Sequence, residues 1–349
     1  MPSFCIKPKP KLNVNMAYQV TLSNSGTRFL VNDDEYVLDA AIRQGIGMPY
    51  GCRNGLCSGC KGKITSGQVR YEGQPDALTE QEKEHGLALF CQAYAQSDLT
   101  IVINELTHSA QVPLKRFPAK VTHIARLNHD VMQIILTLPP SIRMQFFAGQ
   151  YIDFILDDER RRSFSIANAP HEDRHIELHI RHIDGGAFTG EVFDGMQLKD
   201  IVRIEGPLGS FFLREESQRP VILMAGGTGF APIKGIVEHA LNKQITRDFY
   251  IYWGARSAAD LYMHEQVQAW AKQHAQIRYV PVLSEPDADW QGETGFVHEA
   301  VLRDFTTLAD FEVYASGPPA MVYAGRDAFV ERGMDPEYYY SDAFEFAND

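Results

Sequence analysis

The sequence predicts a multidomain protein of the α+β and α/β classes, built from successive units. Its 349 residues exceed the size of one typical domain. Three patterns follow one another: mixed strands and helix, a run of short strands, and strands that alternate with helices. We therefore expect a tail at 1–15, units at 16–105, 117–213 and 214–349, and a linker at 106–116.

Composition and charge narrow the class of protein. Hydrophobic residues make up 44% and charged residues 22%, which is ordinary for a globular protein. A net charge of -12 argues against binding to nucleic acid or anionic membranes, because both need a basic face. No apolar run approaches the ~18 residues of a membrane span, and the start has no apolar signal core. We expect a cytoplasmic protein.

The first unit reads as short strands around one helix. "AYQVTLSNSGTRFLVND" indicates two strands joined by a polar turn at 24–26. "YVLDAAIRQG" indicates a short helix that ends at Gly45. "CKGKITSGQVRY" and "DLTIVINE" indicate further strands.

The cysteine spacing is the strongest chemical signal. Four cysteines follow the pattern C-x4-C-x2-C with a fourth further on: Cys52, Cys57, Cys60 and Cys91. Disulfides are disfavoured in a large chain without an export signal, and structural zinc usually shows two close pairs. The spacing is that of a plant-type [2Fe–2S] cluster. We therefore predict these four as its ligands, and Cys5 as an idle thiol.

The loop around the cysteines suits a cluster. Gly51, Gly55 and Gly59 let the backbone turn tightly against it, and Ser58 can donate to its sulfides. Arg53 has two open roles, as a charge that offsets the cluster or as an ordinary surface arginine. With these motifs, residues 16–105 resemble a plant-type ferredoxin domain, which implies a β-grasp-like fold.

The second unit predicts a small antiparallel barrel, because its short strands are separated by turns. "RRSFSIANAP" at 161–170, taken alone, would be a basic surface turn. With "LHIRHIDGGAFTG" and "GPLGSF" it resembles the FAD-binding barrel of the ferredoxin–NADP reductase superfamily. The resemblance implies that Arg162 pairs with the flavin phosphate, Phe164 lies along the flavin and Ser165 sits near N5. It also implies flavin contacts by Ser163, His179, Ile180, Arg181, Gly186, Phe188 and Thr189.

The third unit predicts a parallel α/β sheet. "PVILMAGGTGFAPIKGIVEHAL" reads as a buried strand, a glycine turn and a helix, and ligands bind at the carboxyl ends of such strands. Alone the turn is a weak signal, and it is not the G-x-G-x-x-G fingerprint. It matches the same superfamily's G-G-T-G-x-x-P, as "SGPPAM" matches its later loop. The resemblance implies nicotinamide contacts by Gly226, Gly227, Thr228, Gly229, Ser316, Gly317, Pro318 and Met321.

Two positions depart from the superfamily pattern or leave a choice. Ser316 stands where relatives carry a cysteine near the nicotinamide, and its hydroxyl can still contact the ring edge. The resemblance implies that an aromatic residue near the C-terminus covers the flavin; Phe344 matches it best, Phe346 is the competitor, and both have a core role as the alternative. We expect Ser165, Thr228, Ser316 and Phe344 to be catalytic.

The loop "GARSAADLYMHEQ" bears on the choice of nucleotide. It supplies the candidate contacts Gly254, Arg256, Ser257 and Asp260. Arg256 could bind the pyrophosphate or a 2′-phosphate, whereas the acids oppose a phosphate and suit a ribose diol. We favour NADH over NADPH.

The three units together predict an electron-transfer enzyme. Nicotinamide gives two electrons at once and a cluster accepts one, so flavin belongs between them. The predicted order is NADH, FAD, [2Fe–2S] and an external protein acceptor. The chain resembles reductase components of oxygenases, and "GGTGFAP", "IYWGARS" and "SDAFEF" are similar to CDP-6-deoxy-glucoseen reductases, which serve a dehydratase, and to flavin reductases. A free-standing flavin reductase and a non-enzymatic iron–sulfur sensor remain the alternatives.

Overall fold

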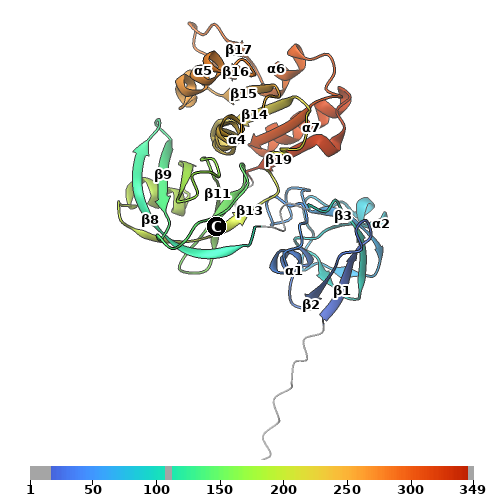
Figure 1. Ribbon diagram of the computed structural model, residues 1–349. Helices are drawn as coiled ribbons and strands as arrows, with labels where there is room; N and C mark the ends of the chain where they lie inside the picture. Colours follow the sequence, from blue (N-terminus) through green and yellow to red (C-terminus); the bar gives the residue numbers. More distant parts are fainter. Residues whose placement is uncertain (1–16, 107–111, 345–349) are drawn as a thin grey trace, which may run out of the picture.

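The computed structural model describes residues 17–106 and 112–344 of the chain. Three large sheets form three domains, with the first domain beside the barrel and the third domain (Figure 1). The predicted tail and Phe346 lie outside the described residues. No helix within the described part is long and apolar enough to cross a membrane.

The first domain is a mixed sheet with the predicted β-grasp-like arrangement. Its five strands run in the order β2-β1-β7-β3-β5, and β1 pairs parallel with β7. The apolar face of α1 is buried against this sheet. The elements are β1 (Ala17–Leu22), β2 (Arg28–Asn32), α1 (Val37–Arg43), β3 (Lys61–Ser66), β4 (Val69–Arg70), α2 (Glu80–Glu84), β5 (Leu87–Leu89), β6 (Tyr94–Ala95) and β7 (Leu99–Val102).

The second domain is the predicted antiparallel barrel. Six strands run in the order β11-β10-β13-β8-β9-β12, and a bridge between Ile166 and Leu178 links the two ends of the sheet. Alternating apolar residues, such as Ile134 and Leu136, fill the interior. The elements are β8 (Lys115–Arg126), β9 (Val131–Thr137), β10 (Tyr151–Ile155), β11 (Arg161–Ser165), β12 (His175–Arg181), α3 (Ala187–Asp194) and β13 (Ile201–Leu208).

The third domain is the predicted parallel sheet, in the order β17-β16-β15-β14-β18-β19. The carboxyl ends of its strands meet at one edge, as a ligand site in such a sheet requires. The elements are β14 (Val221–Gly226), η2 (Gly227–Gly229), α4 (Phe230–Asn242), β15 (Phe249–Ala255), η3 (Ala258–Asp260), α5 (His264–Gln273), β16 (Ile277–Leu283), β17 (Glu293–Thr294), α6 (Val297–Asp304), β18 (Glu312–Gly317), α7 (Pro319–Glu331), η4 (Pro336–Tyr338) and β19 (Tyr339–Ala343).

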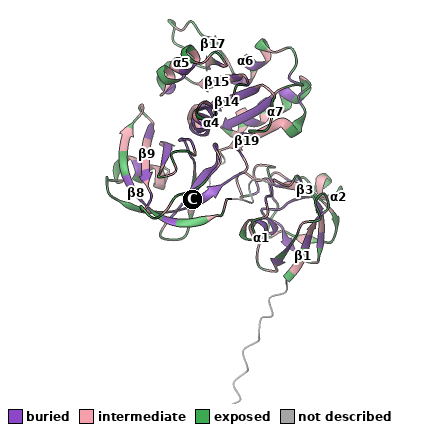
Figure 2. Cartoon of the chain, in the orientation of Figure 1, coloured by how far each residue is buried: buried purple, intermediate pink, exposed green. Residues whose placement is uncertain are grey.

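Two elements of this domain position the site. Helix α4 is buried along most of its length, between its own sheet and the barrel (Figure 2). Strand β19 pairs with β18 and sets Asp342 beside Ser316. Residues 339–343 therefore form a sheet strand, a role that the aromatic pattern "YYYSDAFEF" did not predict.

Candidate active site

The four cysteines of the predicted cluster motif lie together in the first domain. Cys60 and Cys91 are buried, Cys52 and Cys57 are half-buried, and all four are free thiols. Backbone amides of Cys52, Cys57 and Cys91 lie 3.2–3.4 Å from Sγ atoms of the set. Four converging thiols with amide donors fit a [2Fe–2S] cluster, whose sulfurs accept such hydrogen bonds.

Electrostatics and close packing support the same chemistry. The hydrogen bond with Cys57 lowers the pKa of the Cys52 thiol to about 6, and the bond with Cys91 lowers the pKa of Cys60. The same hydrogen bonds raise the pKa of the partner thiols Cys57 and Cys91, so each pair holds one thiolate, the form that binds metal, beside one protonated thiol. A Cβ at Gly51 would lie 3.1 Å from the Cys57 sulfur, so a larger residue would crowd the cluster ligand.

The cluster loop lies against the barrel. The Tyr50 amide donates to Ser210 Oγ at 3.0 Å, and the Ser210 amide donates back to the Tyr50 carbonyl at 3.1 Å. The Tyr151 hydroxyl donates to the Gly51 carbonyl at 3.1 Å. These contacts hold the residues before Cys52 next to β10 of the barrel.

Arg53 joins the same interface, which resolves its two open roles. Its guanidinium lies 2.8 Å from Asp39 of α1 and 3.9 Å from Asp153 of β10, and its side chain is 21% exposed. The pKa of Arg53 is raised, because neighbouring Tyr151, Asp39 and Tyr50 outweigh the effect of burial. Arg53 is therefore a half-buried bridge between the cluster loop and the barrel.

Three polar residues meet where the barrel joins the nicotinamide sheet. Ser165, the last residue of β11, donates through Oγ to Asp342 Oδ2 at 2.9 Å. Burial raises the pKa of Asp342 to about 6, against the hydrogen bond from Ser165, and the nearby Cys52 thiolate adds to the rise. Ser316 is fully buried, and its Oγ has no hydrogen-bond partner among the described residues. Such an orphaned hydroxyl fits a site that a nicotinamide ring completes.

The other predicted flavin residues of β11 have defined surroundings. Arg162 donates to the Arg161 carbonyl at 2.9 Å, and Ser163 Oγ donates to Asp153 Oδ1 at 2.6 Å. The Phe164 ring lies 5.6 Å from that of Phe188, and both rings pack on Phe154. An aromatic wall beside a strand with arginines suits a flat ring with a phosphate. Their contacts with FAD stay predictions.

The turn after β12 differs in detail from its predicted role. Gly186 is the N-cap of α3, so the first amides of that helix are available to an anion. The Thr189 hydroxyl accepts from the Ile183 amide at 3.1 Å and lies 3.3 Å from the Gly186 carbonyl. It therefore holds the turn closed, and a contact between Thr189 and a phosphate stays a prediction.

Two residues of β12 do not direct their side chains to a flavin. His179 Nε2 lies 2.9 Å from Glu177 Oε1, and its Nδ1 lies 3.1 Å from the Tyr262 hydroxyl. Both ring nitrogens are thus engaged by protein, and burial lowers the His179 pKa and keeps the ring neutral. Ile180 is buried in the barrel core. The side chains of both residues therefore build the barrel and its interface, and their contacts with FAD stay predictions.

A cavity of about 570 Å³ lies between the barrel and the nicotinamide sheet. Its volume suits a nucleotide-sized ligand. The predicted residues that line it are Arg181, Gly226, Gly227, Thr228, Gly254, Arg256, Asp260, Pro318 and Met321. Three further predicted residues are sequence neighbours of residues that line the cavity: Gly229, Ser257 and Gly317. The amide of Phe344 donates a hydrogen bond to the Gly317 carbonyl at 2.9 Å.

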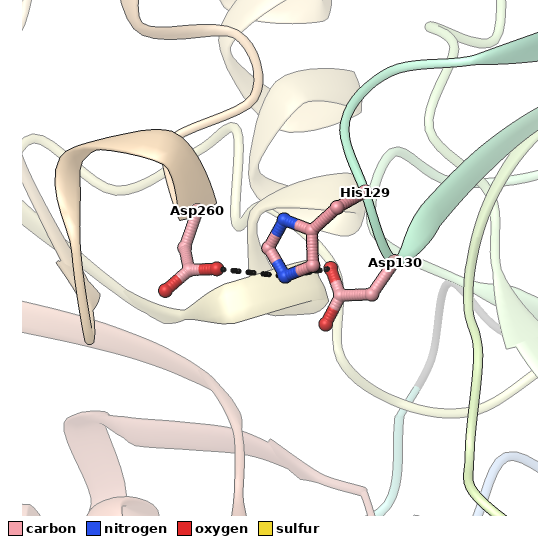
Figure 3. A group of neighbouring side chains, drawn as sticks. All are labelled: His129, Asp130 and Asp260. Atoms are coloured by element: carbon pink, nitrogen blue, oxygen red, sulfur yellow. Dashed lines mark ion pairs between the residues drawn. The ribbon is translucent and has the colours of Figure 1, made fainter.

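Asp260 already has partners within the protein. Its Oδ2 accepts from the Ser257 amide and hydroxyl at 3.0 and 3.2 Å. Figure 3 shows His129 between Asp130 and Asp260, at 3.8 and 3.5 Å from their carboxylates. Arg181 also pairs with Asp130 at 2.8 Å, so polar groups of the barrel and of the third domain meet at the wall of the cavity.

Sequence reasoning missed the residues that join the domains. The sequence patterns gave no role to Tyr50, Tyr151 and Asp153, nor to Ser210 within "GPLGSF", and each of the four acts through a partner about a hundred or more positions away. Asp342 lies two positions before Phe344 in "SDAFEF", and an acidic residue inside this aromatic C-terminal segment was its available signal.

Three family models match successive parts of the chain. They are described as a 2Fe-2S iron-sulfur cluster binding domain, an oxidoreductase FAD-binding domain and an oxidoreductase NAD-binding domain. Their matches cover residues 20–96, 118–213 and 223–327. The predicted [2Fe–2S], FAD and NAD cofactors are confirmed at the level of these domains.

Several relatives match almost the whole chain. A CDP-6-deoxy-L-threo-D-glycero-4-hexulose-3-dehydrase reductase of Yersinia pestis is 40% identical, over 94% of this chain and 99% of its own. The reductase subunit of an aromatic O-demethylase of Amycolatopsis sp. is 37% identical, over 93% and 98%. The solved structure of an Amycolatopsis cytochrome P450 reductase superimposes with a TM-score of 0.79 at 35% identity, over 94% and 98%.

Proposed function

This chain belongs to the family of NAD(P)H-dependent iron–sulfur flavoprotein reductases, and from that premise we propose that it carries electrons from NADH to an oxygenase or dehydratase component. The order is NADH, FAD, the cluster and then the protein acceptor. The observation that carries the proposal is the docking of the cluster loop on the barrel, next to Ser165 and Asp342.

The protein's part in the reaction is to hold groups in place. Bound FAD supplies the ability to take two electrons from a nicotinamide and release them singly. The cavity, which Thr228 lines, would hold the nicotinamide, and the buried Ser316 hydroxyl lies on β18, the strand beside β14 of the same sheet. Cys52, which acts electrostatically on Asp342 and follows the Gly51 carbonyl that Tyr151 contacts, would hold the cluster next to the barrel. Electrons then leave from the first domain.

The finer assignments belong to the same proposal. We place the domain boundaries between β7 and β8 and between β13 and β14. NADH is preferred over NADPH, because both guanidiniums of the cavity, Arg181 and Arg256, have carboxylate neighbours. Four reduced thiols suit the cytoplasm. The acceptor is an oxygenase or a deoxyhexulose dehydratase component, by analogy with the relatives' names.

The test is an anaerobic reaction of the purified holoprotein with NADH, followed by visible spectra over time. We expect the flavin absorbance to bleach first and the iron–sulfur absorbance to follow. Bleaching of the flavin with an oxidised cluster would favour a flavin reductase, and no oxidation of NADH would favour the iron–sulfur sensor.

A further inference from the structure

We infer that Lys234 is a positioning residue for hydride transfer: it fastens helix α4, and the nucleotide-binding turn before it, to the barrel segment that follows β11. The inference rests on the proposed function, since it concerns the step from nicotinamide to flavin. Lys234 contacts no predicted cofactor site, so it acts through the two elements that it joins.

Lys234 is a buried cation with partners from both domains. Its Nζ donates to Glu177 of β12 at 2.9 Å and to the Ala167 carbonyl at 3.3 Å. It also donates to Glu238, one turn along α4, at 3.1 Å. The Lys234 and Glu177 side chains are 8% and 9% exposed. A buried charge of this kind needs such paired partners.

We call the contacts of Lys234 with Glu177, Ala167 and Glu238 the joint between α4 and the barrel. The Glu177 carboxylate extends this joint toward the cavity. It also lies 2.7 Å from Gln133 Nε2 and 2.9 Å from His179 Nε2. Because His179 Nε2 faces a carboxylate, it carries the proton, and Nδ1 accepts from the Tyr262 hydroxyl. Tyr262 lines the nucleotide cavity. The network thus runs from α4 through the barrel to the cavity wall.

Gly235 brings the backbones of the two domains together beside Lys234. A Cβ at Gly235 would lie 3.0 Å from the Asn168 carbonyl oxygen and 3.2 Å from that of Ile166. These atoms are backbone and cannot rotate away. Residues 166–168 follow directly on Ser165, just as α4 follows directly on the turn of β14 and η2.

The joint therefore sets the position of both reactants. Reacting atoms must approach to about 3–3.5 Å, and a misplacement of about 1 Å can slow a reaction roughly 100-fold. Burial alone would lower the pKa of Lys234, but the carboxylates of Glu177 and Glu238 outweigh it and raise the pKa. Lys234 therefore stays protonated at neutral pH, and its contacts with Glu177 and Glu238 do not change with pH in that range.

The first test is Lys234→Met, compared with Lys243→Met at the exposed end of the same helix. In stopped-flow reactions of the holoprotein with NADH, we expect the limiting rate of flavin bleaching to fall roughly ten-fold in Lys234→Met. The dissociation constant of NADH and the cluster spectrum should stay within about two-fold of the wild type. The control should match the wild type.

The second test is Gly235→Ala, which keeps every charge and suits a helix interior. Its added Cβ pushes α4 from the barrel, so we expect a roughly three- to ten-fold slower bleaching with unchanged flavin content. Hydrogen exchange of the Ala167 amide, which donates to the Glu177 carbonyl at 2.8 Å, should rise in both variants. Gly73→Ala is the control, because its Cβ would meet nothing within 4 Å.

These experiments test the positioning role of Lys234 separately from the proposed electron-transfer function. Flavin bleaching at the wild-type rate in both Lys234→Met and Gly235→Ala would contradict the inference that Lys234 positions the reactants. A rate that falls in proportion to flavin content, or a weaker NADH affinity at an unchanged limiting rate, would also overturn it, because Lys234 would then be structural. If the flavin of the wild-type protein does not bleach with NADH, that result contradicts the proposed function and not the contacts of Lys234.

Discussion

Cys57 is the residue whose loss should separate the two halves of the electron path. Cys57→Ser removes one predicted ligand, so the cluster should be lost or strongly altered. Flavin reduction by NADH should stay within about two-fold of the wild type. One-electron reduction of a cytochrome should fall by at least roughly 100-fold.

The matched control for that variant is Cys5→Ser. Cys5 lies outside the cluster motif and outside the described residues. The Cys5→Ser variant should have the same iron content, flavin reduction and cytochrome reduction as the wild type. An equal loss of flavin reduction and cytochrome reduction in Cys57→Ser would contradict the order in which flavin precedes the cluster.

Asp342 makes stability depend on pH through its half-buried carboxyl. Burial raises its pKa from 3.8 to about 6. At pH values between 3.8 and about 6, the folded protein keeps a proton on Asp342 that the unfolded chain has lost. The stabilisation that this carboxyl gives to the folded protein is therefore complete below pH 3.8. It is lost as the pH rises through about 6. Urea unfolding of wild type and Asp342→Asn should show this fall in the wild type alone.

A parallel pH dependence in both proteins would remove Asp342 from that role. Ser165→Ala serves as a second measurement, because the hydrogen bond from Ser165 lowers the Asp342 pKa. Its loss should raise the pH at which the stability falls.

At the scale of the element, strand β11 should hold the flavin through Arg162. Arg162→Ala removes the guanidinium predicted to pair with a phosphate, so purified protein should contain several-fold less FAD. The cluster, in a separate domain, should be complete by iron content and visible spectrum. Arg143→Ala, an exposed barrel arginine paired with Asp173, is the control. Normal FAD content in Arg162→Ala would exclude this residue from the site.

The docked cluster loop should control the second electron-transfer step. Tyr151→Phe deletes the hydrogen bond to the Gly51 carbonyl, a loss of about 1 kcal/mol of docking. We expect cluster reduction after flavin bleaching to slow by up to roughly five-fold, with unchanged bleaching by NADH. Tyr71→Phe removes a hydroxyl that contacts Leu89 within the first domain, and is the comparison. Equal rates in all three proteins would contradict a role for the docking.

At the scale of the whole molecule, the cavity between two domains should select the nucleotide. Arg181 and Arg256 are 2.8 and 3.7 Å from Asp130 and Asp260, so an added 2′-phosphate meets partly neutralised cations. We expect kcat/KM to favour NADH by at least roughly ten-fold, or about 1.4 kcal/mol. Steady-state kinetics with both nucleotides measure it. A preference for NADPH would make Arg256 a ligand of the 2′-phosphate.

Much of this organisation could be predicted from local patterns. The spacing of Cys52, Cys57, Cys60 and Cys91 indicated the cluster, because ligands of one loop are close in sequence. Strand and helix periodicities predicted the barrel and the parallel sheet. The roles of His179 and Thr189 were less accessible, because a motif does not state where a side chain points.

The sequence by itself determined the domain types, the cofactor classes and the cluster ligands, since these depend on short-range pattern and spacing. Only the tertiary structure decided how the domains meet. Ser165 and Asp342 are 177 positions apart, and Tyr50 and Ser210 are 160 apart. Such contacts form when separately patterned elements pack against one another, and the shape of that packing is written in no single segment.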